Sequence, residues 1–196
     1  MKNKLFPLSL VILSASFIIS CGQGSDKAEK SEKEDDVTVK SLKSDIKEID
    51  DSLSVLIKKR LEEDDFKIDR LVYHEGINRS IKFYETFPDD DFAPYALEKV
   101  ASLYDALQIS QKSADWRDTI IVNYPEFDRR LDILELQKAH YDNFETYEPE
   151  KIEHYIELML EMDIPDKKRE DLEYRLEHID LTFLEMVKLL NPDLEL

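Results

Sequence analysis

The fold class is decided by a stretch near the middle of the chain, Phe87-Pro88-Asp89-Asp90-Asp91-Phe92-Ala93-Pro94-Tyr95-Ala96-Leu97-Glu98-Lys99-Val100-Ala101-Ser102-Leu103-Tyr104. An aromatic residue, a proline and three acids come first, and apolar residues then recur at every third or fourth position. A proline ends a helix, and acidic residues are favourable in the first turn of the next one. The apolar spacing is that of one helix face. The stretch therefore predicts a helix boundary followed by an amphipathic helix.

The same kind of boundary recurs towards the C-terminus. Tyr124-Pro125-Glu126 and Ile164-Pro165-Asp166 again combine an apolar or aromatic residue, a proline and an acid. Successive prolines of this type are 37 and 40 residues apart. Between the boundaries apolar residues keep helical spacing, and no clear strand pattern follows Phe66. A period in this range, with two helices per unit, is typical of stacked helical hairpins. We therefore expect an all-α fold.

The junction resembles the one between tetratricopeptide repeats (TPRs) in bacterial envelope lipoproteins. In that family Phe-Pro or Tyr-Pro closes one hairpin, and Ala-Pro-x-Ala-Leu opens the next. The resemblance covers residues 66–190 and implies a divergent TPR-like array of about two and a half to three hairpins. By this resemblance, packing positions of the repeat fall on Leu97, Val100, Ala101, Tyr104, Ser113 and Ile120, and closing prolines on Pro88 and Pro125. The chain departs from the pattern in its bulky Ile120 and in the lack of a glycine after Tyr104.

The first twenty residues have the features of an export signal. Two lysines precede an apolar run, residues 5–19, which is shorter than the ~20 residues that span a bilayer. The run ends in Ile18-Ile19-Ser20-Cys21, which resembles a bacterial lipobox. The resemblance implies removal of residues 1–20 and lipidation of Cys21, the only cysteine of the chain. The alternative is a free cysteine after an ordinary signal peptide.

Residues 21–36 follow as a predicted flexible tether, because Ala28 is their only apolar residue and they contain no aromatic one. The formal net charge of the whole chain is −18, and loss of Lys2 and Lys4 with the signal leaves −20. Such a balance argues against a nucleic-acid-binding surface and favours a protein partner with a basic segment. Gly22 after the cysteine resembles the sorting pattern for the outer membrane; which face of that membrane is left open.

Residues 37–63 predict a long amphipathic helix. Its apolar residues follow a spacing of three and four: Val39, Leu42, Ile46, Ile49, Leu53 and Leu56. One interpretation is a helix that packs this stripe on the next helices. The other is a coiled coil between copies of the chain through residues 39–56.

Residues 64–192 form the predicted repeat domain, which ends in a short closing helix. Thr182-Phe183-Leu184-Glu185 has the form of a capping box, and Asn191-Pro192 ends the helix that follows. A terminal repeat needs such a helix to cover its apolar face. Since Gly76 is the only glycine after the tether, we expect the turns to be made by proline, asparagine and acidic residues.

Residues with catalytic or ligand-binding chemistry form no recognisable site. The chain contains three glycines, which excludes the glycine-dependent dinucleotide, Walker A, EF-hand and nucleophile-elbow motifs. The four histidines lack zinc spacing. Residues 89–91 lack the glycine and the alternating acids of a calcium loop, so we favour a charge role at the next helix N-terminus. We expect no metal, no cofactor and no enzymatic activity.

The leading hypothesis is a lipid-anchored envelope protein whose repeats bind another protein. An oligomeric coiled-coil spacer is the alternative, and an envelope hydrolase is the minor one. The aromatic residues that a binding groove would use are Tyr95, Tyr104, Trp116, Tyr141 and Tyr147, although packing is the commoner role of aromatics on repeat helices.

Overall fold

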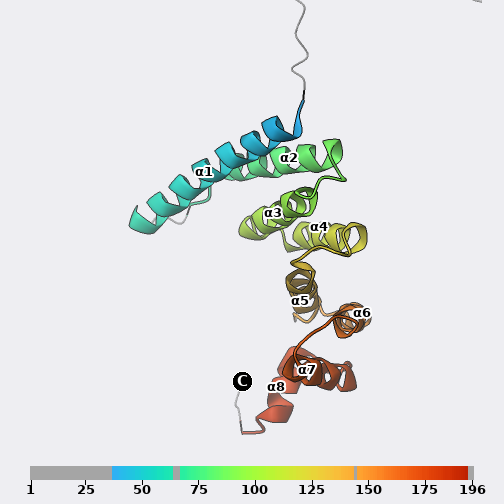
Figure 1. Cartoon of the computed structure of the whole chain (residues 1–196). Helices are drawn as coiled ribbons and strands as arrows, with labels where there is room; N and C mark the ends of the chain where they lie inside the picture. The colour runs from blue at the N-terminus through green and yellow to red at the C-terminus, as the bar shows by residue number, and fades with distance from the viewer. Residues whose placement is uncertain (1–36, 64–66, 144, 194–196) are drawn as a thin grey trace, which may run out of the picture. The chain divides into compact units, whose positions relative to one another are not determined.

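The computed structural model describes residues 37–63, 67–143 and 145–193, which all lie in one unit of the chain, residues 36–196. These residues form eight α-helices and no strand (Figure 1), so the predicted all-α fold is confirmed. The helices are α1 (Val39–Glu63), α2 (Arg70–Thr86), α3 (Ala93–Ala106), α4 (Ser110–Asn123), α5 (Arg130–Tyr141), α6 (Pro149–Leu160), α7 (Asp166–Glu177) and α8 (Phe183–Leu190).

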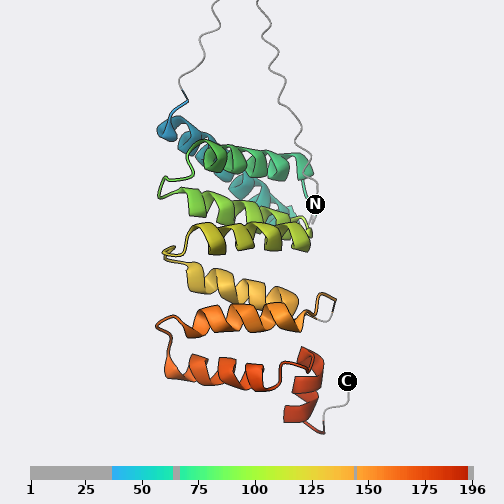
Figure 2. The same ribbon diagram turned by 90° about the vertical axis from the view of Figure 1, so that its right-hand side faces the viewer.

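Helices α1 to α7 pack in the order of the sequence, each against the next. They follow one another down a stack (Figure 2), with α3 and α5 on one side of it and α4 and α6 on the other (Figure 1). Hairpins that bury their apolar faces against their neighbours produce such a stack. The described residues thus form a stack of helical hairpins, while its likeness to the TPR arrangement stays a prediction.

The proline boundaries are built by local hydrogen bonds. The Phe87 N–H donates to the Phe83 carbonyl at 2.9 Å and completes the last turn of α2. The Asp90 carboxylate accepts the Phe92 N–H at 2.9 Å, and Pro94 lies in the first turn of α3, where no N–H is needed. The three predicted boundaries all lie between helices, at Pro88, Pro125 and Pro165.

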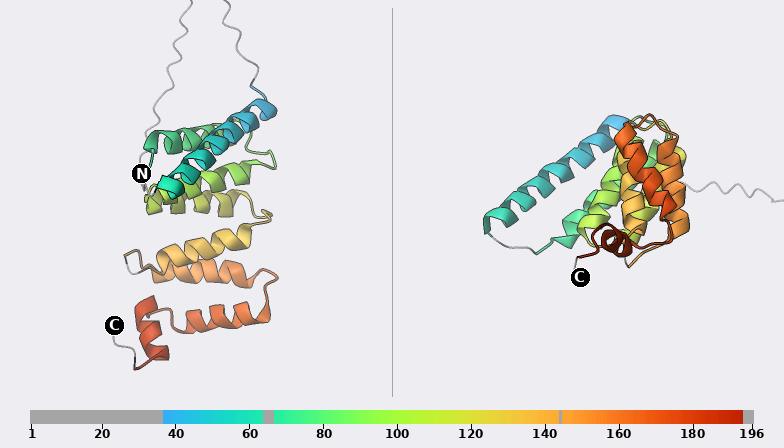
Figure 3. Two further views of the ribbon diagram at one scale, coloured as in Figure 1. Left: turned by 90° about the vertical axis from the view of Figure 1, so that its left-hand side faces the viewer. Right: turned by 90° about the horizontal axis from the view of Figure 1, so that it is seen from below.

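Helix α1 packs its apolar stripe on α2 and α3, across which it runs (Figure 3). Four residues of the stripe are buried: Leu42, Ile46, Ile49 and Leu53. The three helices come close at Gly76, where an added Cβ would lie 2.9 Å from Leu103 Cδ1 and 3.6 Å from Leu53 Cδ1. This burial agrees with packing inside one chain; a coiled coil through residues 39–56 would require α1 to separate from α2 and α3.

The turn between α3 and α4 differs from the expected composition. Gln108 has a φ of 60°, in the left-handed region that glycine adopts most easily. The Ile109 N–H donates to the Tyr104 carbonyl at 2.9 Å and closes the turn. The expectation that proline, asparagine and acidic residues make all the repeat turns is therefore wrong at this position, where a glutamine adopts the conformation.

The C-terminal helix α8 is present, and its capping box is confirmed by bonds in both directions between Thr182 and Glu185. None of its residues is buried, and Phe183 is 62% exposed. The large core cluster of the stack reaches only Leu172, Leu176 and Ile179, so these residues cover its C-terminal end. Helix α8 therefore covers the last repeat less completely than expected: Met186 and Val187 are half-buried, whereas Phe183, Leu184, Leu189 and Leu190 stay exposed.

Several sequence predictions fall outside the described residues. They are the signal and tether (residues 1–36) and, within them, Ile18, Ile19, Ser20 and Cys21. In the part of the chain that the structure describes, no helix combines the length and the apolar character that crossing a membrane requires.

Candidate functional site

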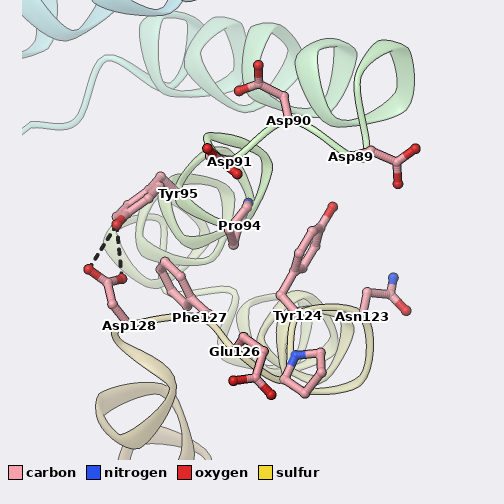
Figure 4. Close-up of a pocket in the computed structure, with 11 residues that line it drawn as sticks. Asp89, Asp90, Asp91, Pro94, Tyr95, Asn123, Tyr124, Glu126, Phe127 and Asp128 are labelled. Atoms are coloured by element: carbon pink, nitrogen blue, oxygen red, sulfur yellow. Dashed lines mark hydrogen bonds between the residues drawn. The ribbon is translucent and has the colours of Figure 1, made fainter.

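Two depressions of the stack meet and form the candidate site. The first, which we call the junction pocket, lies between the α2–α3 and α4–α5 connections and has a volume of about 470 Å³ (Figure 4). It is lined by Asp89, Asp90, Asp91, Pro94, Tyr95, Asn123, Tyr124, Pro125, Glu126, Phe127 and Asp128. The two connections are the ones that the Phe-Pro and Tyr-Pro motifs predict, so the repeat of the motif builds the pocket.

Aromatic side chains form the walls of the junction pocket. The Tyr124 hydroxyl donates to the Pro88 carbonyl at 2.7 Å and ties the two connections together. Burial, with smaller contributions from Tyr84 and Asp89, raises the pKa of Tyr124 to about 12, which keeps this hydroxyl protonated. Tyr95 packs edge-on to Phe127, with ring centroids 4.9 Å apart.

The rim of the junction pocket is acidic. No basic side chain lines it, whereas five carboxylates do. Only Asp90 has an ion pair, with Lys43 at 2.7 Å, and this bond together with the Phe92 N–H holds the pKa of Asp90 below its usual value. The Tyr95 hydroxyl donates to Asp128 at 2.9 Å. The three remaining carboxylates are exposed and make no ion pair with the described residues: Asp89, Asp91 and Glu126.

The junction pocket has no arrangement suited to a metal. Among the described residues no group of three or more histidine, cysteine or acidic side chains could hold an ion. In Figure 4 the side chains of Asp89, Asp90 and Asp91 point in different directions rather than towards one centre.

The second depression, which we call the odd-helix groove, follows the face of α1, α3, α5 and α7. Its first part lies between α1 and α3 and reaches Arg129. Its second part lies between α5 and α7, with a volume of about 640 Å³, and its third lies between the end of α5 and α8. The first and second parts share Arg129, and the second and third share Lys138 and Ala139. Tyr95 lines both the first part and the junction pocket. The two depressions therefore border each other at Tyr95.

Ion pairs between helices balance the charges of the odd-helix groove. Lys99 on α3 binds Asp50 on α1 at 2.6 Å, and Arg129 binds Glu98 at 2.8 Å. Lys168 on α7 pairs with Glu135 on α5. In total the groove is lined by five basic and six acidic side chains. Each neighbouring pair of odd-numbered helices is thus joined by a charge pair.

The deepest of these pairs joins Arg175 on α7 to Asp142 at the end of α5. Their side chains are 5% and 7% exposed, and two nitrogens of Arg175 bind the two carboxylate oxygens at 3.1 and 2.8 Å. Arg175 also donates to the His178 and Leu181 carbonyls. Burial alone would raise the pKa of Asp142, but the bonds and charges of Arg175 and Lys138 outweigh it and hold this pKa below its usual value. The pair fixes the chain that leads into α8.

The negative charge of Glu98 in the groove is only partly compensated by its surroundings. Burial raises the pKa of Glu98 above its usual value, and the charge of Arg129 only partly opposes this effect.

Apolar side chains are exposed in the second and third parts of the groove. Leu136 on α5 is 48% exposed, and on α8 Phe183 and Leu184 are 62% and 44% exposed. Leu136 lies in the part between α5 and α7, and the other two face the end of α5. This end of the groove can therefore bury apolar groups of a ligand.

The residues that the TPR resemblance singled out lie mostly in the core rather than in the site. Leu97, Val100, Ala101, Ser113 and Ile120 are buried, and Tyr104 is partly buried. The Ser113 hydroxyl donates to the Ala101 carbonyl at 2.8 Å, where α4 packs on α3. Pro88 lies next to the junction pocket, and Pro125 lines it.

Of the aromatic candidates for a groove, Tyr95 alone lines either depression. Tyr141 is buried, and Tyr104, Trp116 and Tyr147 pack partly buried against the core clusters.

Sequence reasoning missed Leu136, Arg175 and Asp142. Leu136 could have been identified from the sequence, because this apolar residue lies outside the helical stripe of Leu131 and Leu134 that predicts the core. The pairing of Arg175 with Asp142 had none, since 33 residues separate the two.

Comparison of the chain with known protein families, curated proteins and solved structures gives no match. The site is therefore interpreted from its own geometry.

Proposed function

We propose that this protein is a lipid-anchored envelope protein that holds a segment of another protein in the odd-helix groove. The observation that supports the proposal is the exposed apolar surface of Leu136, Phe183 and Leu184 in a groove whose charges are already paired. Exposed apolar patches of this kind mark interaction sites, because their burial by a partner is favourable.

The arrangement of the groove suits an extended ligand. Its parts run along α5 from Arg129 to Asn143, which is about 20 Å at the rise of an α-helix. A length of about 20 Å corresponds to six or seven residues of an extended segment or to about fourteen residues of a helix.

A photo-crosslinking amino acid at position 136 tests this proposal in cells. The matched control is position 122, because Val122 is also an exposed apolar residue, at 76%, but lies on α4 outside the groove. We expect a defined crosslinked protein from position 136 and none from position 122. The purified partner should then bind the Leu136→Lys variant at least about tenfold more weakly than the Val122→Lys variant. Equal crosslinking from the two positions, or none from position 136, would contradict the proposal.

The anchor is proposed from the lipobox resemblance and is tested separately. We expect palmitate labelling and membrane fractionation of the full chain, and loss of both in a Cys21→Ala variant. Labelling that persists in this variant would exclude Cys21 as the lipidation site. Protease treatment of intact cells then distinguishes a surface-exposed body from a periplasmic one.

A further inference from the structure

The junction pocket and the odd-helix groove differ in charge although they border each other. The groove is nearly balanced, whereas the pocket is lined by five carboxylates and no basic side chain. They meet where Tyr95 lines both, and where the consecutive residues Asp128 and Arg129 line one each. A segment lying along α5 in the groove therefore reaches the acidic pocket with one end.

We propose that the partner segment is bipartite: apolar residues pack on Leu136, Phe183 and Leu184, and a lysine- or arginine-rich end occupies the junction pocket. This inference rests on the proposed function and adds the chemistry of the partner. A second copy of the chain is a poorer occupant, because its net charge of −18 would be brought against the acidic pocket.

Three features of the pocket fit a basic side chain. Asp89, Asp91 and Glu126 are exposed acceptors that no cation of the described residues neutralises. The aromatic residues Tyr95 and Tyr124 line the pocket, and aromatic rings attract cations. These three carboxylates are exposed, so a guanidinium or an ammonium group can bind them without losing all of its hydration.

The groove, by contrast, has few unpaired charges that could bind a charged group of the ligand. Its basic side chains are held in pairs with neighbouring helices, as in Lys99–Asp50 and Arg129–Glu98. A charged ligand group there would compete with a pair that already exists, whereas an apolar group gains by covering Leu136. The charge pattern of the site thus assigns the basic end to the pocket and the apolar residues to the groove.

A random library of 15-residue peptides, displayed on phage and selected on the purified full-length protein, tests the inference. We expect enriched peptides to combine a cluster of lysine or arginine at one end with apolar residues in the remainder, and to bind more weakly as salt rises. Enrichment of peptides that lack a basic end, or that are acidic, would overturn the inference. Enrichment of no peptide would overturn it together with the proposed function.

Charge-neutralising variants locate the basic end. In the Asp89→Asn/Asp91→Asn/Glu126→Gln variant we expect the enriched peptides to bind about tenfold more weakly. The matched control is Glu153→Gln/Glu157→Gln/Glu161→Gln, which removes the same charge from exposed residues at α6 and its C-cap. It should keep the affinity within twofold, and circular dichroism checks that both variants are folded.

The outcomes separate the two proposals. Equal affinity of the two charge variants, with binding still lost in Leu136→Lys, would overturn the basic end and leave the groove proposal standing. Unchanged affinity in Leu136→Lys would overturn the groove proposal itself. Sedimentation of the full chain as a dimer that dissociates in Leu136→Lys would identify a second copy as the occupant and overturn the bipartite partner.

Discussion

The odd-helix groove and the junction pocket share Tyr95, yet most charged side chains of the groove form ion pairs and most of those of the pocket form none. In the groove, carboxylates such as Asp50, Glu98 and Asp142 bind basic side chains of neighbouring helices. In the pocket, Asp89, Asp91 and Glu126 of the two connections lie together without such partners, and only Asp90 has one, Lys43 on α1. The groove charges hold helices together, whereas three of the five pocket carboxylates, Asp89, Asp91 and Glu126, contribute no ion pair to the stack. Charged groups that do not stabilise a fold are candidates for binding, since stability and function often compete.

The largest expected effect comes from breaking the buried pair of the groove. Arg175→Met leaves the Asp142 carboxylate buried with only Lys138 beside it, at 3.3 Å. We expect the free energy of unfolding, measured by urea denaturation, to fall by about 3–5 kcal/mol. Arg175→Met/Asp142→Leu should recover most of this loss, because no uncompensated charge remains. A double variant as unstable as the single one would show that Arg175 stabilises the fold through its packing and its bonds to the His178 and Leu181 carbonyls rather than through Asp142.

The second effect is a pH dependence that comes from the same pair. The folded-state pKa of Asp142 lies below its ordinary value of 3.8, so the unfolded chain takes up the proton more readily. The stability that this group contributes is complete above the unfolded-state pKa and is lost as the pH falls through the folded-state value. A difference of one bound proton gives a slope of about 1.4 kcal/mol per pH unit. Unfolding measured between pH 5 and pH 2 should show a shallower acid slope in Asp142→Asn than in the wild type; equal slopes would exclude this group.

A smaller effect is expected at the start of the groove, where the pair is partly exposed. The side chains of Lys99 and Asp50 are 27% and 35% exposed, so water screens their attraction. Lys99→Met should lower the free energy of unfolding by about 0.2–1 kcal/mol. Added salt should reduce the difference from the wild type. A loss as large as that of Arg175→Met would mean that burial does not set the strength of the groove pairs.

The smallest effect on stability is expected in the junction pocket. Asp89→Asn/Asp91→Asn/Glu126→Gln removes like charges that make no ion pair with the described residues. We expect the free energy of unfolding to change by no more than about 0.5 kcal/mol, in the direction of greater stability. Urea denaturation at low salt measures this difference. A clear loss of stability would assign these carboxylates a structural role and would remove the contrast with the groove.

Much of the fold could be predicted because the signals are local. The prolines at 88, 125 and 165 act on the residues next to them, and all three boundaries are found where the sequence predicts them. The capping box of α8 requires only Thr182 and Glu185, which are three positions apart in the first turn. Helical spacing likewise depends on the nearest turns, so the all-α class follows from the sequence.

The candidate site was less predictable because its residues come together from different helices. The apolar stripe of α1 fits a coiled coil as well as it fits α2 and α3, and only the tertiary structure shows it buried. The exposure of Phe183 on α8 also depends on what lies beside that helix, which its own amphipathic pattern does not reveal. Gln108 adopts a left-handed conformation that its residue type does not favour.

The sequence by itself determined the helical class, the three proline boundaries and the acidic balance, because backbone conformation and composition depend on near neighbours and on residue counts. Only the tertiary structure decided which charges are neutralised. Asp142 and Asp89 are the same residue type, yet one is buried against Arg175 and the other lies on the rim of the junction pocket. An ion pair between helices requires that both side chains reach one point in space, and the stacking of distant helices alone sets that condition.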